Sequence, residues 1–285
     1  MDELIGITEE EAAILDAALI EAHEDQDTQA EAEEDINNLP LNSPSLLVND
    51  TTSRFSSAEW FNKIQEQVVT LGGLGGIGSY VAFLLGRLKV KNLFMYDFDS
   101  VEEANLSGQL YSTDNIGQPK TTAIALMLVK YCQYYNSLEK NDAFVLESPT
   151  TDIMIGGFDS MTARYNFYHA WKKRVQAKKT KEDKEKCLLI DARLAAEEFQ
   201  VFCIKGTDDY LMKKYEEDWL FSDDQAEATV CSYKQTSFCA NMIGSVVVNL
   251  FVNFVANQLN PFVERALPFI TKYDAKRMFL KIEDV

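Results

Sequence analysis

The chain has 285 residues, of which 46% are hydrophobic, so it can bury the core of one large α/β domain. Its net charge of −18 is concentrated at the start, because residues 1–50 hold 15 of the 45 acidic residues and no Lys or Arg. The rest is nearly balanced, with 30 acidic and 27 basic residues, which argues against a nucleic-acid-binding protein with a basic surface.

Three further features concern the compartment. The first residues lack a basic stretch leading into an apolar one, so we expect no secretory signal. The most apolar stretch, 242–259, is interrupted by three asparagines, so we expect no membrane span. The five cysteines include no CxxC pair, which predicts a reduced, cytoplasmic protein without structural zinc.

Residues 1–50 are predicted to form an acidic N-terminal extension. Apolar residues recur at helical spacing over 8–23, which indicates a short amphipathic helix, and a Pro- and Asn-containing linker ends near residue 50. The extension could dock a basic partner or act only as a solvated tail. A single domain is predicted over 51–285.

In this domain, apolar runs of strand length alternate with longer amphipathic stretches. Helices are predicted over 56–67, 76–88, 118–135, 159–179 and 236–259, and strands over 68–72, 92–97, 143–147, 152–157, 186–193 and 198–205. The order predicts an α/β fold, a Rossmann-like, doubly wound, mostly parallel sheet with a mixed antiparallel edge. A C-terminal β-hairpin is expected over 266–284.

The first junction between a strand and a helix reads GGLGGIGS, in which Gly73, Gly75 and Gly78 satisfy GxGxxG, with Gly76 between them. Such glycines permit a tight turn and a close approach of phosphate to the backbone at a helix N-terminus. Asp97 follows at the end of the next strand, where an acid can accept hydrogen bonds from ribose hydroxyls. The sequence therefore predicts a dinucleotide or adenylate site.

A dehydrogenase would be expected to carry a catalytic acid–base as well, and histidine is the usual choice. The chain contains only His23, in the acidic extension, and His169, in the aromatic helical stretch YNFYHAW. In such a stretch a histidine is more often packed in the core than catalytic. This makes an NAD-dependent oxidoreductase a weaker hypothesis, which stays open.

The residues from Asp97 onward, DFDSVEEANLSGQLYSTDNIGQPK, resemble the ThiF/MoeB/HesA family, the adenylating module of ubiquitin-activating enzymes. The matching positions are Asp97, Asp99, Val101, Asn105, Leu106, Gln109, Gly117 and Lys120. Further on, GGFDSMTARYN resembles a second family segment and places Asp159 and Arg164. The opening TSRFSSAEWFNKIQEQ resembles the segment that begins the family domain and places Arg54, so the resemblance covers roughly residues 52–283.

The resemblance implies an enzyme that binds Mg²⁺ and ATP and adenylates the C-terminal glycine carboxylate of a ubiquitin-like or sulfur-carrier protein. Lys120 and Arg54 are the implied phosphate cations, Asp159 the Mg²⁺ ligand, and Asp97 the ribose acceptor. The remaining implied nucleotide-binding residues are Gly73, Gly75, Gly76, Gly78, Asp99, Asn105 and Gln109. Family members form homodimers in which the opening arginine reaches the partner's ATP, so Arg54 is expected to act in trans.

Several of these residues also have structural explanations. Asp159 could cap the following helix, Asn105 could shape a turn, Lys120 could be a solvated surface lysine, and Arg164 could be an ion-pair partner. The chain also departs from the family pattern at Gly108, where the family has an arginine, and this puts full adenylation activity in question.

Many family members pass the activated carboxylate to a cysteine before the long apolar helix, as a thioester or persulfide. Cys231 is the candidate for that step, since it follows an acidic lead-in and has Lys234 nearby. Cys239 is a second candidate, near a helix start, that could equally face the core. Cys132, Cys187 and Cys203 are expected in the core. A non-catalytic nucleotide-binding or scaffold relative stays open as an alternative, favoured by Gly108.

Overall fold

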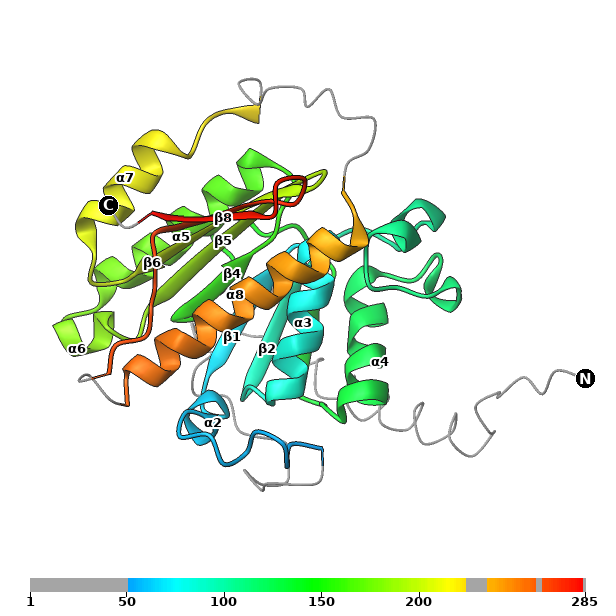
Figure 1. The fold of residues 1–285 in the computed structure, drawn as a ribbon, viewed down its shortest axis with the longest axis horizontal. Helices are drawn as coiled ribbons and strands as arrows, with labels where there is room; N and C mark the ends of the chain where they lie inside the picture. The colour runs from blue at the N-terminus through cyan, green and yellow to red at the C-terminus, as the bar shows by residue number, and fades with distance from the viewer. Residues whose placement is uncertain (1–50, 224–234, 260–262, 284–285) are drawn as a thin grey trace, which may run out of the picture. The chain divides into compact units, whose positions relative to one another are not determined.

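The computed structural model describes residues 51–223, 235–259 and 263–283 (Figure 1). The predicted extension over residues 1–50 lies outside this part of the chain, and so does Cys231. One eight-stranded sheet, in the order β3-β2-β1-β4-β5-β6-β7-β8, forms the centre of the domain. The strands are β1 (Val68–Gly72), β2 (Asn92–Tyr96), β3 (Ser137–Lys140), β4 (Ile153–Gly156), β5 (Leu188–Ala195), β6 (Glu198–Lys205), β7 (Ile270–Asp274) and β8 (Phe279–Glu283).

The pairing of the strands confirms the predicted fold class. The strands β3, β2, β1, β4 and β5 are parallel to their neighbours, whereas β6, β7 and β8 each pair in antiparallel fashion. Every residue of β1, β2 and β4 is buried, as expected of strands that are covered on both faces. The last two strands form the predicted C-terminal hairpin.

Helices cover both faces of the sheet. They are α2 (Phe61–Ile64), α3 (Gly76–Leu88), α4 (Lys120–Cys132), α5 (Met161–Ala177), α6 (Lys181–Lys184), α7 (Asp209–Asp218) and α8 (Ser237–Asn257), with the 3-10 helices η2 (Glu103–Ser107) and η3 (Thr113–Asn115). One face carries α3, α4 and α8, whose apolar side chains join those of the sheet in one core cluster. On the other face, α5 packs on β4 and β5, and Tyr168 of α5 contacts Tyr215 of α7.

The helix α8 is the longest of these helices and lies across α3, β5 and β6 (Figure 1). The helices α8 and α3 approach closely at Gly244 of α8, where an added Cβ would lie 3.0 Å from the Cβ of Tyr80 in α3. By length and composition α8 would also be able to cross a bilayer. Its buried side chains, which include Ile243, Val247 and Phe251, instead form part of the core.

Sequence periodicity was a poor guide in three places. The stretch 143–147 is not a strand, because Phe144 turns inward to pack its ring edge-on against Tyr96 and Phe167. The strand on that side is β3, a half-buried polar edge strand without apolar alternation. The predicted helix over 56–67 is helical only at α2, and α7 was not predicted.

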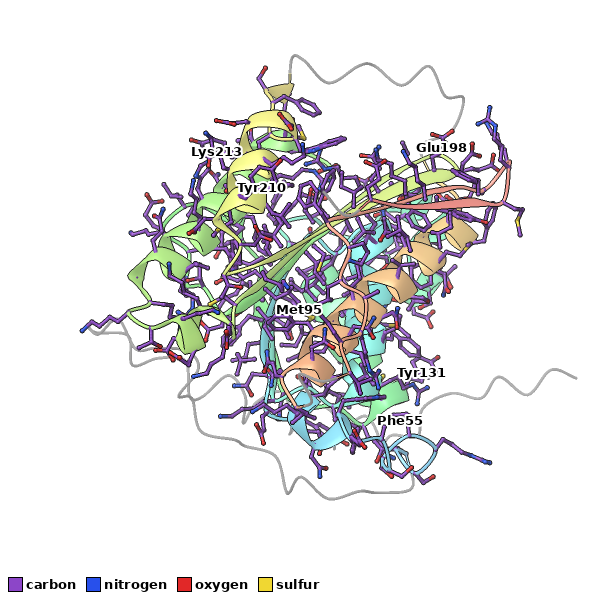
Figure 2. All side chains as sticks on the ribbon, turned by 60° about the vertical axis from the view of Figure 1, so that its left-hand side comes forward. Phe55, Met95, Tyr131, Glu198, Tyr210 and Lys213 are labelled. Atoms are coloured by element: carbon purple, nitrogen blue, oxygen red, sulfur yellow. The ribbon has the colours of Figure 1, made fainter. Side chains whose placement is uncertain are left out.

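The segment before β1 lies at the amino end of that strand. Phe55 stacks on Trp60, with ring centroids 6.5 Å apart, and meets the edge of Phe61. Figure 2 shows Phe55 at this end of the sheet, away from the interior position of Met95 on β2. This placement matters for Arg54, which belongs to the same segment.

The core position of α8 predicts a large effect of truncation at Phe251. We expect Phe251→Ala to lower the free energy of unfolding by about 3–5 kcal/mol, because it removes a fully buried ring. Asn249→Ala, on the exposed side of the same helix, should change it by no more than about 0.5 kcal/mol. Urea unfolding of the chain measures both. Equal effects would contradict a core role for α8.

Candidate functional site

The position of the site follows from the register of three strands. Gly72, the last residue of β1, lies opposite Tyr96 at the end of β2 and opposite Gly156 at the end of β4. The residues that follow these strands therefore meet at one edge of the sheet. The chain reverses its direction of strand addition at β1, and ligands in open α/β sheets bind at such a switch point.

The glycine turn, residues 73–78, is shaped by close backbone contacts. Gly73 has φ +78°, a conformation that favours glycine. An added Cβ on Gly78 would overlap the carbonyl oxygen of Gly73, so the turn can close only without a side chain there. Because the first α-helical hydrogen bond is from Ser79 N–H to Gly75 O, the N–H groups before Ser79 at the start of α3 have no partner within the helix.

The segment after η2 holds this turn from one side. The Tyr111 hydroxyl donates to Leu74 O at 2.7 Å, and Leu110 N–H donates to Ser79 Oγ at 3.0 Å. Gln109 lies beside Gly75, where an added Cβ would be 3.9 Å from its Nε2. The Oε1 atom of Gln109 is buried and has no hydrogen-bond partner among the residues that the structure describes.

Asp97 ties the turn to the end of β2. Its carboxylate accepts from Leu74 N–H at 2.6 Å and from Asp99 N–H at 2.9 Å. Burial raises the pKa of Asp97, although Lys120 and the two N–H donors oppose this shift. A carboxylate has about four acceptor positions, so the two backbone bonds leave room for a ribose hydroxyl. The predicted ribose contact is compatible with this geometry and stays a prediction.

Lys120 is not a solvated surface lysine. It is the first residue of α4, its side chain is 7% exposed, and its Nζ donates to Asp99 Oδ2 at 2.8 Å. The ammonium group carries three N–H donors, and the bond to Asp99 uses one of them. Lys120 therefore lies next to the carboxylates at the end of β2, and its role as a phosphate cation stays a prediction.

Asp159 lies just beyond β4 with an exposed carboxylate. The sequence left open that Asp159 caps the following helix. The N-cap of α5 is instead Ser160, whose Oγ accepts from Ala163 N–H at 3.2 Å. The next N–H group, that of Met161, donates to Asp223 at 2.6 Å. Within residues 51–223, 235–259 and 263–283, Asp159 has no hydrogen bond or ion pair, so its carboxylate is available to a ligand.

Asn105 and Arg164 have structural roles. The Asn105 Oδ1 accepts from Glu102 N–H at 2.9 Å and closes the capping box of η2. Arg164 is buried, forms an ion pair with Asp191, and donates to the carbonyl oxygens of Phe158 and Ala192. Arg164 thus joins α5 to β5 and to the loop after β4.

The carboxylate of Asp191 is the centre of a buried cluster. Arg193 Nε approaches it at 2.7 Å, and the Tyr215 hydroxyl donates to it at 2.9 Å. Burial alone would raise the pKa of Asp191, but Arg164, Arg193 and the hydrogen bond from Tyr215 outweigh it, so the pKa is lowered. The carboxylate is therefore ionised and fully satisfied.

Arg54 lies far from the glycine turn of its own chain. It is exposed and precedes α2, which leads into the amino end of β1, whereas the turn follows the carboxyl end. The five residues of β1 span about 17 Å. The described part of the chain contains no ion-pair partner for Arg54. One chain therefore does not bring Arg54 to its own site.

The structure shows whether Cys239 is accessible or faces the core. It is fully buried on the inner side of α8, and burial raises the pKa of its thiol. A buried, protonated thiol is a poor nucleophile. Of the two alternatives stated for Cys239, the structure therefore favours the one in which its side chain faces the core. Cys132, Cys187 and Cys203 are buried, as predicted.

Gln235 is a residue at the site that the sequence did not reveal. Its side chain lies over Gly76 and over Gly108, since an added Cβ on Gly76 would overlap its Oε1 and one on Gly108 would lie 2.8 Å from its Nε2. Gln235 lies more than 100 positions after both glycines in the chain. No local sequence pattern relates Gln235 to Gly108. Only information that linked the two positions directly would have indicated the contact.

Comparison with known families identifies the family of the chain. The family model of the ThiF family matches residues 49–284, which is most of the chain. The chain belongs to the ThiF family. The resemblance found in the motifs between Arg54 and Arg164 is thereby confirmed.

Among curated proteins, this ThiF-family chain is similar to ubiquitin-like modifier-activating enzyme 5. It is 33% identical to the Arabidopsis thaliana protein over 111 residues, which is 39% of this chain and 24% of that protein. It is 28% identical to the Drosophila willistoni protein over 134 residues, or 45% and 32% of the two chains. The matches thus span about a quarter to a third of these relatives.

Solved structures share the fold at low identity. PaaA superposes with a TM-score of 0.61 at 16% identity, covering 98% of this chain and 84% of PaaA. E. coli MccB with ATP superposes with a TM-score of 0.58 at 17% identity, covering 83% and 72%. Both support the mostly parallel sheet with antiparallel C-terminal strands.

The close contact at Gly78 predicts that a single methyl group opens the glycine turn. We expect Gly78→Ala to destabilise the protein by about 2 kcal/mol or more, because the methyl collides with a backbone oxygen. Gly75→Ala is the matched control, since its nearest neighbour would be the Gln109 amide at 3.9 Å, and its cost should be smaller. Thermal unfolding compares the two. A Gly78→Ala protein as stable as the wild type would contradict this turn.

The buried cluster predicts that Arg164 supports the fold. Arg164→Ala leaves Asp191 buried with one cation fewer, and we expect a loss of about 3 kcal/mol in the free energy of unfolding. Lys181→Ala, which breaks the exposed pair with Glu185, should cost at most about 0.5 kcal/mol. Unchanged stability together with lost nucleotide binding in Arg164→Ala would show instead that Arg164 contacts the ligand.

Proposed function

We propose that this chain is an ATP-dependent adenylyltransferase that activates the C-terminal glycine carboxylate of a ubiquitin-like or sulfur-carrier protein. The observation that carries the proposal is the meeting of a phosphate-accommodating glycine turn, the buried cation Lys120 and the free carboxylate of Asp159 at one switch point. The family match and the likeness to ubiquitin-like modifier-activating enzymes support it. The neighbour MccB was solved with ATP.

Four features of the site fit ATP. The start of α3 offers N–H groups without helical partners, which suit phosphate oxygens. The buried Oε1 of Gln109 lacks a partner beside the same turn and would accept from a hydroxyl or N–H group of the nucleotide. Asp97 keeps free acceptor positions for a ribose, and Lys120 keeps two N–H donors for phosphate oxygens.

The proposed reaction is a displacement at phosphorus. An oxygen of the acceptor's carboxylate attacks the α-phosphorus of ATP, the bond to the bridging oxygen breaks, and pyrophosphate leaves. Lys120 would stabilise the charge on the phosphate oxygens, and the N–H groups of the turn would hold the phosphates in place. Asp159 would hold Mg²⁺, which takes one or two carboxylates together with phosphate oxygens and water.

The local charge supports the proposal of a further cation. Lys120 is already paired with Asp99, and Asp97 lies beside them, so two carboxylates face one ammonium group. No arginine stands at Gly108. Arg54 has no partner in the described part of its own chain, and we infer that it completes the site of a partner subunit in a homodimer. Cytoplasmic location and Mg²⁺ dependence form part of the same proposal.

A later transfer step would use Cys231. The described cysteines are all buried, so none of them offers an accessible thiol. Cys231, outside the described residues, is the remaining cysteine of the five. The Cys231 thiolate would attack the carbonyl carbon of the acyl-adenylate to form a thioester and release AMP. A persulfide on Cys231 would instead need a separate sulfane-sulfur donor.

A non-catalytic nucleotide-binding relative is the second candidate, and Gly108 favours it. An NAD-dependent oxidoreductase has less support, because His169 lies eight residues past the start of α5, about 12 Å along the helix from its N-terminus. There it packs against Tyr165 and Tyr168. Burial lowers the pKa of His169 in this aromatic setting.

The direct test of the proposal is ATP–pyrophosphate exchange with an acceptor protein that ends in glycine. The wild type should catalyse Mg²⁺-dependent exchange, and Asp159→Asn should reduce the rate about 100-fold or more, because the metal loses its carboxylate. Stability should not change, since Asp159 is exposed. Glu59→Gln, an equally exposed acid at the opposite end of β1, is the control and should exchange normally. Full exchange by Asp159→Asn would refute its role as the metal ligand.

The trans role of Arg54 predicts complementation between two inactive variants. Arg54→Ala and Lys120→Ala should each be inactive alone, while a reassorted equal mixture should recover about a quarter of the wild-type exchange rate, because half of the dimers are mixed and each has one intact site. Arg54→Ala mixed with itself is the control. No recovery, despite proven subunit exchange, would show that Arg54 acts within its own chain or not at all.

A further inference from the structure

Gln235 reaches the glycine turn from a distant part of the chain. Its side chain fills the space next to Gly108, where an added Cβ would lie 2.8 Å from Nε2, 3.0 Å from Cγ and 3.2 Å from Cδ. The same amide lies on Gly76, so a methyl group there would overlap Oε1. The amide thus spans the gap between the start of α3 and the end of η2, and the absence of a side chain at Gly108 makes room for it.

The backbone holds Gln235 in this position. Gln235 forms a parallel bridge with Ala196, at the turn between β5 and β6, and the next N–H group, that of Thr236, donates to Ala196 O at 3.3 Å. The helix α8 begins directly afterwards, at Ser237. Figure 1 shows the start of α8 beside the segment that contains η2 and η3. The position of the side chain therefore follows from the sheet and the helix together.

Two side-chain amides flank the same turn with hydrogen-bonding capacity to spare. Gln235 makes no side-chain hydrogen bond to the residues that the structure describes. Gln109, beside Gly75, has a buried Oε1 without a partner there. Only the NH₂ group of a side-chain amide donates, and its two N–H bonds suit phosphate oxygens without adding charge, whereas an amide oxygen such as Gln109 Oε1 accepts and would pair with a hydroxyl or N–H group of the nucleotide.

We propose that Gln235 is a phosphate-positioning residue of the nucleotide site, occupying the space that opens at Gly108 and donating from its amide to the nucleotide. This inference rests on the proposed function. Because an amide carries no net charge, Gln235 contributes directed hydrogen bonds to the phosphates, whereas Lys120 contributes a positive charge. An arginine at position 108 would collide with Gln235, so the two positions are coupled.

Calorimetric titration of the full-length chain with Mg²⁺ and ATP tests the assignment. Gln235→Ala should weaken ATP binding about tenfold, the effect of losing one hydrogen bond to a charged group. Gln133→Ala is the matched control and should bind like the wild type, since this exposed glutamine ends α4 at the opposite end from Lys120. Gln235→Arg should tighten binding and increase its dependence on salt, whereas Gln133→Arg should change neither.

A second pair of variants tests the coupling. Gly108→Arg alone should lower the melting temperature and weaken ATP binding, because the new side chain meets Gln235. Adding Gln235→Ala to Gly108→Arg should restore both, so the two substitutions are strongly non-additive. Additive effects would overturn the steric half of the inference.

The outcomes separate this inference from the proposed function. If the wild type binds ATP and Gln235→Ala binds it equally well, Gln235 does not position phosphate, and the proposed function stands. If the wild type itself does not bind ATP, the proposed function fails and the role of Gln235 fails with it. Tenfold weaker binding by Gln235→Ala alone, at unchanged melting temperature, is the result that the structure predicts.

Discussion

The common ending of β1, β2 and β4 is the constraint on which the rest of the site depends. Gly72 pairs with both Tyr96 and Gly156, so the loops after three strands begin at the same level of the sheet. The bond from Leu74 N–H to Asp97 then fixes the glycine turn against the end of β2. Burial of this carboxylate is costly, and two N–H donors and Lys120 compensate for it. A shift of one residue in either pairing would separate the turn from its carboxylates.

Much of this arrangement was predictable from the sequence. The bounds of β1, α3 and β6 coincide with the apolar runs and glycines that predicted them, because buried parallel strands and a glycine turn leave strong local signals. The structure places Lys120 and Asp97 together, as the motif spacing implied. The sequence left two roles open for Arg164, a ligand contact and a structural ion pair. Its contact with the buried Asp191 of β5 favours the ion pair.

The parts that escaped prediction depend on contacts between distant segments. In the stretch 143–147, Phe144 packs between Tyr96 and Phe167, and this tertiary packing overrides the strand pattern. Gln235 is an ordinary polar residue in sequence, and its place over Gly108 arises from the bridge to Ala196. Cys239 has a helix-start position that suggested reactivity, but the inner face of α8 buries it.

The charges around the turn point to a site that is completed by its ligand and by a partner. Two carboxylates face one lysine, the family arginine is absent at Gly108, and Arg54 lies at the other end of the sheet. Binding of ATP compared with NAD, by calorimetry on the wild-type chain with Mg²⁺ present, tests the central claim most directly. The account predicts saturable ATP binding at one site per chain, with NAD at least about tenfold weaker. Tight binding of NAD without binding of ATP would contradict it.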